Sequence, residues 1–216
     1  MLGAVVLAAG TGSRMGGVAK CLITVDGETL LQRLLSAVHR LDPLQTVLVL
    51  GHHAESIQTA LRKVPPAFPL TLVHNPAPGD SPSSSLRLGL HALVPEVDTV
   101  MVLLADQPLL GASDLQRALQ FFEGRSTAQR IGWPVHASEP GHPVLLQADL
   151  AREWLAQDQA GLRPWALQRP QQVAVWAPGN THHTRDLDTP EALARLSLDT
   201  GQAWALPQAG AKTPQT

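Results

Sequence analysis

The chain has 216 residues, of which 44% are hydrophobic and 16% are charged, a composition too apolar and too weakly charged for a disordered protein. Its 16 Lys and Arg against 18 Asp and Glu give a net charge of −2, which argues against nucleic acid or anionic lipid as the main partner. The length favours one domain, with room for a small appended lobe.

The single cysteine, Cys21, cannot form an intrachain disulfide or a thiolate-rich metal site, and this favours the cytoplasm. Residues 1–9 are apolar but lack a basic segment and run directly into a glycine-rich turn, so we expect no signal peptide. The other apolar runs are far shorter than the roughly 20 residues that cross a bilayer, so we expect no membrane partner.

Short apolar runs alternate with amphipathic stretches, a pattern typical of βαβ units and a largely parallel sheet. The runs predicted to be strands are residues 5–8, 46–50, 70–74, 99–104, 130–135, 142–146 and 173–176. The stretches predicted to be helices are residues 30–41, 54–62, 83–93, 112–122, 150–157 and 189–198. The run at 99–104 is apolar throughout, which predicts a central strand.

This order of elements predicts an α/β fold that is Rossmann-like, with a mostly parallel central sheet flanked by helices in three layers. We expect residues 1–205 to form a single domain. From Pro207 onward the chain contains Pro, Gln, Ala, Gly, Lys and Thr, which bury too little surface to become ordered, so residues 206–216 are predicted to form a flexible tail.

A glycine-rich loop, Gly-Thr-Gly-Ser-Arg-Met-Gly-Gly at residues 10–17, follows the first predicted strand. Such a loop exposes backbone N–H groups to an anion, and Arg14 and Lys20 add two positive charges, so it predicts a polyphosphate site. A P-loop is excluded because no Gly-Lys-Ser/Thr follows, and the glycines are one residue too widely spaced for a dinucleotide fingerprint. The alternative interpretation is a flexible turn with two solvated cations.

Carboxylates occur where a ligand site is expected. Asp106 follows the apolar run at 99–104 and thus marks the C-terminal edge of a central strand, where open α/β sheets bind ligands. Asp186 and Asp188 lie at a predicted strand-to-helix junction. Asp106 with either of them would supply the one or two oxygen ligands that Mg²⁺ takes beside phosphates. Alternatively, Asp106 is a turn residue and Asp188 or Thr189 caps a helix.

Together these motifs resemble the signature of the nucleotidyltransferases related to molybdenum cofactor cytidylyltransferase. The first block reads Val6-Leu-Ala-Ala-Gly10-x-Gly-Ser-Arg14-Met-Gly16-x-x-x-Lys20. The later blocks, in the order of the family, are Asn75-Pro76, Gly79, Ser83-Ser-Ser-Leu86, Gly89-Leu90, Ala105-Asp-Gln-Pro108, Gly141-His-Pro-Val144 and Asp186-Leu-Asp-Thr-Pro190.

The resemblance implies a nucleotide-diphospho-sugar transferase-like fold and Mg²⁺-dependent transfer of CMP from CTP to the terminal phosphate of molybdenum cofactor, with release of pyrophosphate. It implies catalytic roles for Arg14, Lys20 and Asp106. It also implies that Asp106 and Asp188 bind Mg²⁺, with Asp186 as an alternative ligand. The residues that would hold the nucleotide are Ala8, Ala9, Gly10, Gly12, Ser13, Arg14, Lys20, Ser84 and Ser85.

The form Ala8-Ala9-Gly10 is associated with members that use cytidine nucleotides. The resemblance further implies that His142 contacts the substrate and that a xanthine-dehydrogenase-type molybdoenzyme receives the product. Three alternatives stay open: another phosphate acceptor, GTP in place of CTP, or a non-catalytic accessory protein that binds nucleotide or cofactor.

Two histidine pairs, His52-His53 and His182-His183, lack the i, i+4 spacing and supporting carboxylate of a helical zinc site. We therefore interpret them as polar loop residues. Cys21 follows Lys20 directly, and we expect it to pack as a small apolar residue beside the glycine-rich loop.

Overall fold

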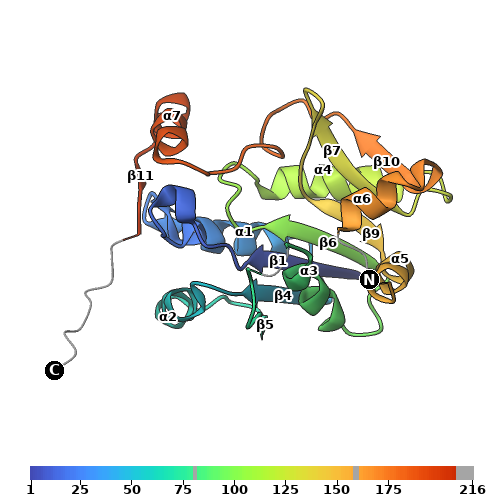
Figure 1. Ribbon diagram of the computed structural model, residues 1–216. Helices are drawn as coiled ribbons and strands as arrows, with labels where there is room; N and C mark the ends of the chain where they lie inside the picture. Colours follow the sequence, from blue (N-terminus) through green and yellow to red (C-terminus); the bar gives the residue numbers. More distant parts are fainter. Residues whose placement is uncertain (80–81, 158–160, 208–216) are drawn as a thin grey trace.

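The computed structural model describes residues 1–79, 82–157 and 161–207, and within them eight strands form one sheet (Figure 1). Most of the predicted tail, residues 208–216, lies outside the described residues. The strands in their order across the sheet are β10 (Val173–Trp176), β7 (Ile131–His136), β9 (Val144–Gln147), β6 (Thr99–Leu104), β1 (Leu2–Ala8), β4 (Gln45–Leu50) and β5 (Thr71–His74), with β8 (Glu139–Pro140) paired to β7.

The sheet is mostly parallel, as the sequence predicts. β1 pairs in parallel with β4 and β6, β4 with β5, and β7 with β10. β9 is antiparallel to both of its neighbours, β6 and β7. Only a short segment, which contains β8, connects β7 to β9. A connection this short allows antiparallel pairing, whereas parallel neighbours need a longer crossover. The prediction of a central strand at 99–104 is confirmed, since β6 has three strands on each side.

Helices cover both faces of the sheet, which gives the three predicted layers. Their bounds are α1 (Leu30–His39), α2 (Ala54–Lys63), α3 (Pro82–His91), α4 (Ala112–Glu123), α5 (Ala148–Leu155), α6 (Leu162–Leu167) and α7 (Pro190–Thr200). Apolar side chains of α1, α2 and α4 pack on one face, and those of α3, α5 and α6 pack on the other. Strand side chains alternate between the two clusters, because successive residues of a strand point to opposite faces.

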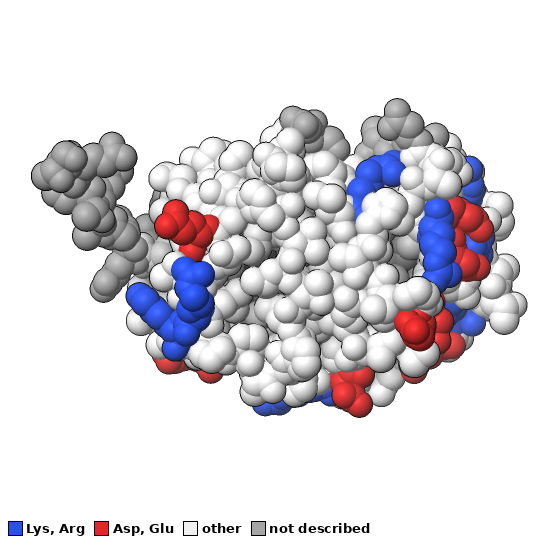
Figure 2. Space-filling view, turned by 90° about the horizontal axis from the view of Figure 1, so that it is seen from below, with Lys and Arg blue, Asp and Glu red and all other residues white. Residues whose placement is uncertain are grey.

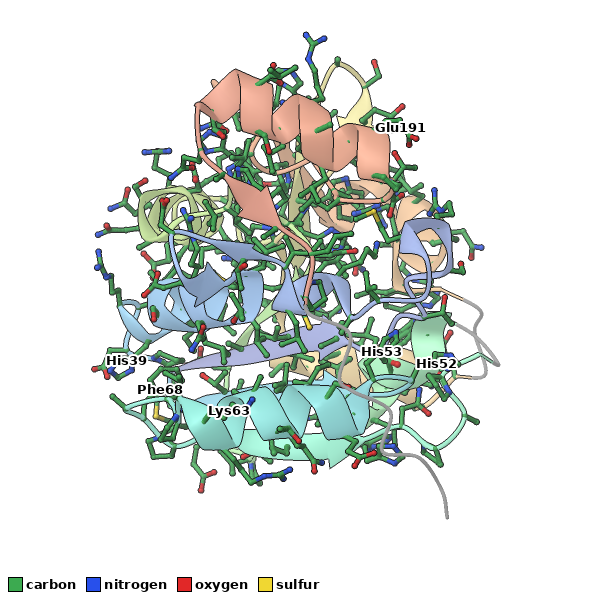
Figure 3. All side chains as sticks on the ribbon, turned by 90° about the vertical axis from the view of Figure 1, so that its left-hand side faces the viewer. His39, His52, His53, Lys63, Phe68 and Glu191 are labelled. Atoms are coloured by element: carbon green, nitrogen blue, oxygen red, sulfur yellow. The ribbon has the colours of Figure 1, made fainter. Side chains whose placement is uncertain are left out.

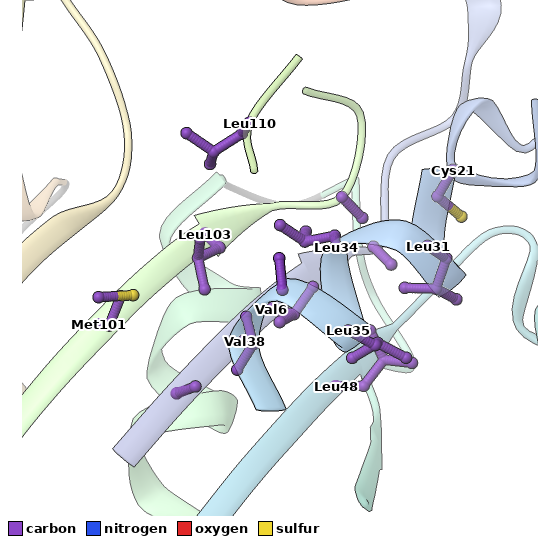
Figure 4. Close-up of a cluster of buried hydrophobic side chains, with 14 of the residues drawn as sticks. Val6, Cys21, Leu31, Leu34, Leu35, Val38, Leu48, Met101, Leu103 and Leu110 are labelled. Carbon is purple, nitrogen blue, oxygen red and sulfur yellow. The ribbon is translucent and has the colours of Figure 1, made fainter. Parts of the chain in front are cut away.

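Figure 4 shows the cluster on one face of the sheet. Val6, Leu48 and Leu103 project from three adjacent strands toward α1, whose Leu34 and Val38 meet them. The neighbouring residues Val5, Val47, Val49 and Val102 belong to the cluster on the opposite face. The apolar residues that recur at helical spacing in α1 therefore pack against the alternate apolar residues of the strands.

The predicted elements are confirmed to within a few residues, and the small ones were missed. α6 has six residues including a proline, too few to show a helical period. A second sheet in the described chain joins three two-residue strands, β11 (Trp204–Ala205), β2 (Thr24–Val25) and β3 (Glu28–Thr29). Strands this short carry no alternation that a sequence pattern can report.

A third apolar cluster joins the two ends of the described chain. It contains Met15 of the glycine-rich loop, Val25 of β2, Leu193 and Leu196 of α7, and Trp204 of β11. In Figure 1, α7 accordingly lies at a corner of the molecule near the N-terminal segment that follows β1. This packing brings the segment before α7 to the carboxyl end of the central strands.

No helix in the described ranges combines the length and the apolar character that crossing a membrane requires. The face shown in Figure 2 has its charged side chains toward the two ends and the rim, with acidic and basic groups near one another and a largely uncharged middle.

Candidate active site

A cavity of about 410 Å³ opens at the carboxyl ends of β1, β4 and β6. Open α/β sheets bind ligands at this edge, because the loops that leave neighbouring parallel strands converge there. Its lining residues are Leu7, Ala8, Ala9, Gly10, Thr11, Gly12, Ala19, Lys20, Cys21, His52, His53, Ile57, Pro78, Gly79, Ser85, Leu104, Ala105 and Asp106.

The glycine-rich loop forms one wall of the cavity. Gly12 has a φ of +61°, and a Cβ built on it would lie 2.0 Å from the carbonyl oxygen of Val18, so only glycine fits there. The Gly12 carbonyl accepts hydrogen bonds from the N–H groups of Met15 and Gly17, at 2.8 and 2.9 Å, which closes a tight turn. Met15 anchors that turn in the third apolar cluster. The loop is thus held at both its backbone and its side chain.

A histidine at the start of α2 also fixes this loop. His53 Nε2 lies 2.9 Å from the carbonyl oxygen of Thr11, and because a carbonyl only accepts, Nε2 donates. His52 and His53 lie side by side at the start of α2, with Lys63 at its far end (Figure 3). From the sequence these histidines are interpreted only as polar loop residues, but in the structure both line the cavity.

Lys20 holds two carboxylates from distant parts of the chain. Its Nζ lies 2.5 Å from Asp106 Oδ2 and 2.8 Å from Asp188 Oδ1, and Arg14 lies 2.9 Å from Asp188 Oδ2. Burial lowers the pKa of Lys20, but the charges and hydrogen bonds of Asp106 and Asp188 outweigh it and raise the pKa above its usual value. The hydrogen bond from Lys20, with the charges of Lys20 and Arg14, lowers the pKa of Asp188. Both partners of the pair are therefore charged at neutral pH.

Backbone contacts bring Asp188 to this position. The N–H of Leu187 donates to the carbonyl of Asp106 at 3.3 Å, and the Leu187 side chain is fully buried. The helix cap is Thr189, whose hydroxyl accepts from the N–H of Ala192 at 3.2 Å. Asp188 is not needed as a cap and instead points to Lys20.

A third carboxylate, Asp186, is held by Gln107. Gln107 is buried, and its Nε2 donates to Asp186 Oδ1 at 3.2 Å and to the carbonyl of His183 at 3.0 Å. Burial, followed by the charge of Asp106, raises the pKa of Asp186 to about 6, against the lowering effect of the Gln107 hydrogen bond. Sequence reasoning missed Gln107, although it belongs to the Asp-Gln-Pro block that follows β6.

The donor set fits a magnesium ion shared with a substrate. No group of three or more His, Cys, Asp or Glu side chains in the described ranges is arranged to hold a metal by itself. Asp106 and Asp188 present two carboxylates to the same ammonium group, and carboxylate oxygens suit hard divalent cations. Mg²⁺ typically takes only one or two carboxylates and completes its shell with phosphates and water. The residues present therefore fit the group.

Ser85 also lines the cavity, together with Pro78 and Gly79. Asn75, directly after β5, donates from Nδ2 to the hydroxyl oxygens of Ser84 and Ser85, at 2.9 Å each. Ser84 is not among the lining residues. Asn75 opens the Asn-Pro block of the sequence, but no role could be assigned to it without its partners.

His142 lies outside the cavity. Its N–H donates to the His183 carbonyl at 2.9 Å, and its carbonyl accepts from His183 Nδ1 at 2.8 Å. Burial, with a smaller effect of the Arg163 charge, lowers the pKa of His142 to about 3, so its ring is neutral at physiological pH. His182 in turn contacts the buried Asp114, with Nδ1 2.9 Å from Oδ2. Both histidines of the second pair thus form contacts within the protein, His182 with Asp114 of α4 and His183 with the backbone of His142.

The structure gathers most of the predicted site residues. The predicted residues that line the cavity are Ala8, Ala9, Gly10, Gly12, Lys20, Ser85 and Asp106. Asp188 joins them through its ion pair with Lys20, and Arg14 through its ion pair with Asp188. Ser13, Ser84 and His142 are not part of the cavity lining. Cys21 packs in the apolar core as predicted (Figure 4), and burial raises the pKa of its thiol to about 12.

Comparison with known proteins shows the family of this chain. A family model described as MobA-like NTP transferase domain matches residues 4–173. The bifunctional protein GlmU of Methylibium petroleiphilum is 32% identical over 132 residues, which cover 59% of this chain and 28% of that protein. Two further GlmU proteins are covered over 23% and 26% of their length, so the chain spans only a minor part of the curated relatives it matches.

Three solved structures, of two proteins, are similar over nearly their whole length. Rv0371c from Mycobacterium tuberculosis H37Rv has a TM-score of 0.74 and 25% identity, covering 91% of this chain and 97% of that chain. Rv0371c is also known as a complex with manganese, with a TM-score of 0.67, 25% identity and coverage of 90% and 97%. A nucleotidyl transferase from Methanothermobacter (Mth528) has a TM-score of 0.71 and 25% identity, with coverage of 91% and 95%.

Proposed function

The chain belongs to the MobA-like NTP transferase family of nucleotidyltransferases, and on that premise we propose that it transfers CMP from CTP to the terminal phosphate of molybdenum cofactor, releasing pyrophosphate. One observation carries the proposal. Lys20 lies between Asp106 and Asp188 beside a glycine-rich loop, at the carboxyl end of the central strands.

In the proposal the triphosphate lies along the glycine-rich loop. The N–H groups of residues 10–12 and the charges of Lys20 and Arg14 would bind it, and the same charges would stabilise the negative charge that develops when the α-phosphate is attacked. Asp106 and Asp188 would hold Mg²⁺, which when bound neutralises phosphate charge and polarises the reacting phosphoryl group. The manganese complex of Rv0371c supports a divalent cation in a protein of this fold.

The rest of the cavity suits a nucleoside. Ala8 and Ala9 contribute only small methyl side chains to the lining, and Ser85 contributes a hydroxyl. We assign the base to Ser85 because its hydroxyl can form a hydrogen bond with a base, and we assign the phosphates to Lys20, Arg14 and the glycine-rich loop. The Ala8-Ala9-Gly10 form supports CTP as the nucleotide.

The acceptor would approach from the side of Asp106 that faces residues 141–142. The hydrogen bonds of Gln107 and His142 to the His183 carbonyl connect this side to the carboxylates. His142 is neutral, so it would contact the acceptor by shape or a hydrogen bond rather than by charge. In this proposal the protein acts in the cytoplasm and passes the product to a xanthine-dehydrogenase-type molybdoenzyme.

The test is pyrophosphate release from each of the four nucleoside triphosphates with Mg²⁺ or Mn²⁺, with and without molybdenum cofactor. Release that requires both CTP and the cofactor supports the proposal. Release with GTP, or with a sugar phosphate in place of the cofactor, would overturn the substrate assignment and leave the nucleotidyltransferase assignment intact. Tight CTP binding without release under any condition would favour an accessory protein that binds nucleotide.

A further inference from the structure

We infer that Asn75 is a specificity-positioning residue, which orients the Ser85 hydroxyl so that it donates a hydrogen bond to the nucleotide base. The inference rests on the proposed function, because it assumes that the cavity holds a nucleotide. It goes further by assigning base selection to a buried residue that is not among those lining the cavity.

The position of Asn75 is fixed by the sheet. Asn75 directly follows β5 and extends its pairing, since its N–H donates to the carbonyl of Leu50 at 2.8 Å. Its side chain is only 2% exposed and lies between the end of β5 and the first turn of α3. A buried amide in such a place must satisfy both of its ends, because an unpaired polar group there is costly.

The orientation of the amide follows from one backbone group. The N–H of Ala77 lies 3.0 Å from Asn75 Oδ1, and a backbone N–H is a donor only. Rotating the amide by half a turn would place the NH₂ group against that N–H, so the carbonyl oxygen must face Ala77. The NH₂ group therefore faces Ser84 Oγ and Ser85 Oγ, at 2.9 Å from each.

This orientation decides what Ser85 offers to the cavity. The amide NH₂ cannot accept, so the Ser85 oxygen accepts from it and the hydroxyl proton must be donated elsewhere. Ser85 is 6% exposed and lines the cavity, and the described residues provide no acceptor for that proton. We therefore infer that the Ser85 hydroxyl donates its proton to an acceptor atom of the bound ligand.

A fixed donor at this point selects among bases. Cytosine presents two adjacent acceptors, O2 and N3, whereas uracil presents an N–H at N3. The Ser85 oxygen keeps one lone pair, but its proton needs an acceptor, so the acceptor edge of cytosine satisfies the hydroxyl better than a base that presents N–H at the same place. Asn75 also holds Ala77, and through it the segment that carries Pro78 and Gly79 on the same wall.

Replacing Asn75 with aspartate tests the inference with almost no change of shape. A carboxylate still accepts from the Ala77 N–H, but its second oxygen also accepts, so Ser85 would turn its proton inward and offer only lone pairs to the cavity. Asn75→Asp, Ser85→Ala and the double variant are compared by calorimetric titration with CTP, UTP and inorganic tripolyphosphate, each with Mg²⁺.

Gln45→Glu is the matched control. Gln45 also donates to a hydroxyl, Thr71 Oγ1 at 3.1 Å, and accepts from a backbone N–H, that of Val94 at 2.8 Å. It lies at the first residue of β4, at the opposite end of the strand from the cavity. Like Asn75→Asp, Gln45→Glu replaces a hydrogen-bonded amide with a carboxylate, but it does so away from the cavity.

We expect Asn75→Asp to weaken CTP binding about tenfold, or about 1.4 kcal/mol, and to leave tripolyphosphate binding unchanged. Ser85→Ala should do the same, and the double variant should bind CTP no more weakly than the weaker single variant, because both substitutions remove one interaction. The preference for CTP over UTP should fall in all three, and Gln45→Glu should bind like the wild type.

Additive losses in the double variant, or an equal loss of tripolyphosphate binding, would overturn the inference. If Asn75→Asp does not fold, Ser85→Ala decides alone, and unchanged CTP binding in it overturns the inference. A wild-type protein that binds neither CTP nor tripolyphosphate would instead refute the proposed function on which the inference depends.

Discussion

Replacing Lys20 with methionine removes one positive charge and keeps most of the side-chain volume. Nζ lies 2.5 Å from Asp106 Oδ2 and 2.8 Å from Asp188 Oδ1, so the variant leaves two carboxylates without their shared cation. Arg14 remains, but it contacts Asp188 on the other oxygen. We expect the variant to be less stable than the wild type and to depend more on a divalent cation.

The burial of the three groups sets the size of the effect. The side chains are 17% exposed for Lys20, 23% for Asp106 and 35% for Asp188. Exposed ion pairs are worth about 0–1 kcal/mol, and breaking a buried one costs about 3–5 kcal/mol. An intermediate site predicts a loss of about 2 kcal/mol in the free energy of unfolding, or about 4–8 °C in Tm for a chain of this length.

The assay is urea unfolding with and without Mn²⁺. A cation that binds the folded state alone stabilises it, so Mn²⁺ should restore stability to Lys20→Met more than to the wild type. Arg130→Met is the control, because Arg130 is 19% exposed and its Nη2 lies 3.0 Å from Asp149 Oδ2 and 2.7 Å from Glu153 Oε1, both on α5. It should lose about 1 kcal/mol, recover nothing with Mn²⁺ and keep its activity.

Two results would refute the reasoning. Lys20→Met as stable as the wild type would mean that its carboxylates need no counter-ion. Equal recovery of Lys20→Met and Arg130→Met with Mn²⁺ would mean that the metal acts elsewhere than at Asp106 and Asp188.

Three further predictions concern Asp106, Gly12 and His142. Asp106→Ala should lower pyrophosphate release by about 10³-fold with an unchanged circular dichroism spectrum, and near-wild-type release would contradict the metal assignment. Gly12→Ala should lower the free energy of unfolding by more than about 2 kcal/mol, because its φ is +61° and the new Cβ would strike Val18; Gly10→Ala, where nothing lies within 4 Å, should be near neutral in thermal unfolding. The folded protein keeps His142 neutral down to its pKa of about 3, whereas the unfolded chain protonates it below about 6.5, so stability should fall between those pH values by up to about 1.4 kcal/mol per unit. Urea unfolding of His142→Gln across that range should show a shallower slope, and an identical slope would contradict the assignment.

Much of the fold follows from local pattern. The apolar runs of the central strands and the periodic leucines of α1 predict the layers, because strand and helix periods are properties of neighbouring residues. The glycine-rich loop is also readable, since its glycines free the backbone for an anion. α6 and the small sheet were missed because six-residue and two-residue elements carry too little periodicity to separate them from loops.

The amino-acid sequence by itself determined which groups this protein has for phosphate and metal chemistry: the glycine-rich loop, Lys20, Asp106 and the carboxylates before α7. Only the tertiary structure decided how they meet. Lys20 and Asp188 are 168 residues apart, and the third apolar cluster brings them into contact. The orientation of the Asn75 amide is fixed only by the hydrogen bond that it accepts from the Ala77 N–H. Hydrophobic periodicity depends on neighbouring residues and so predicts local structure. The partner of a charge or a hydrogen bond depends on which distant segments the tertiary fold brings together.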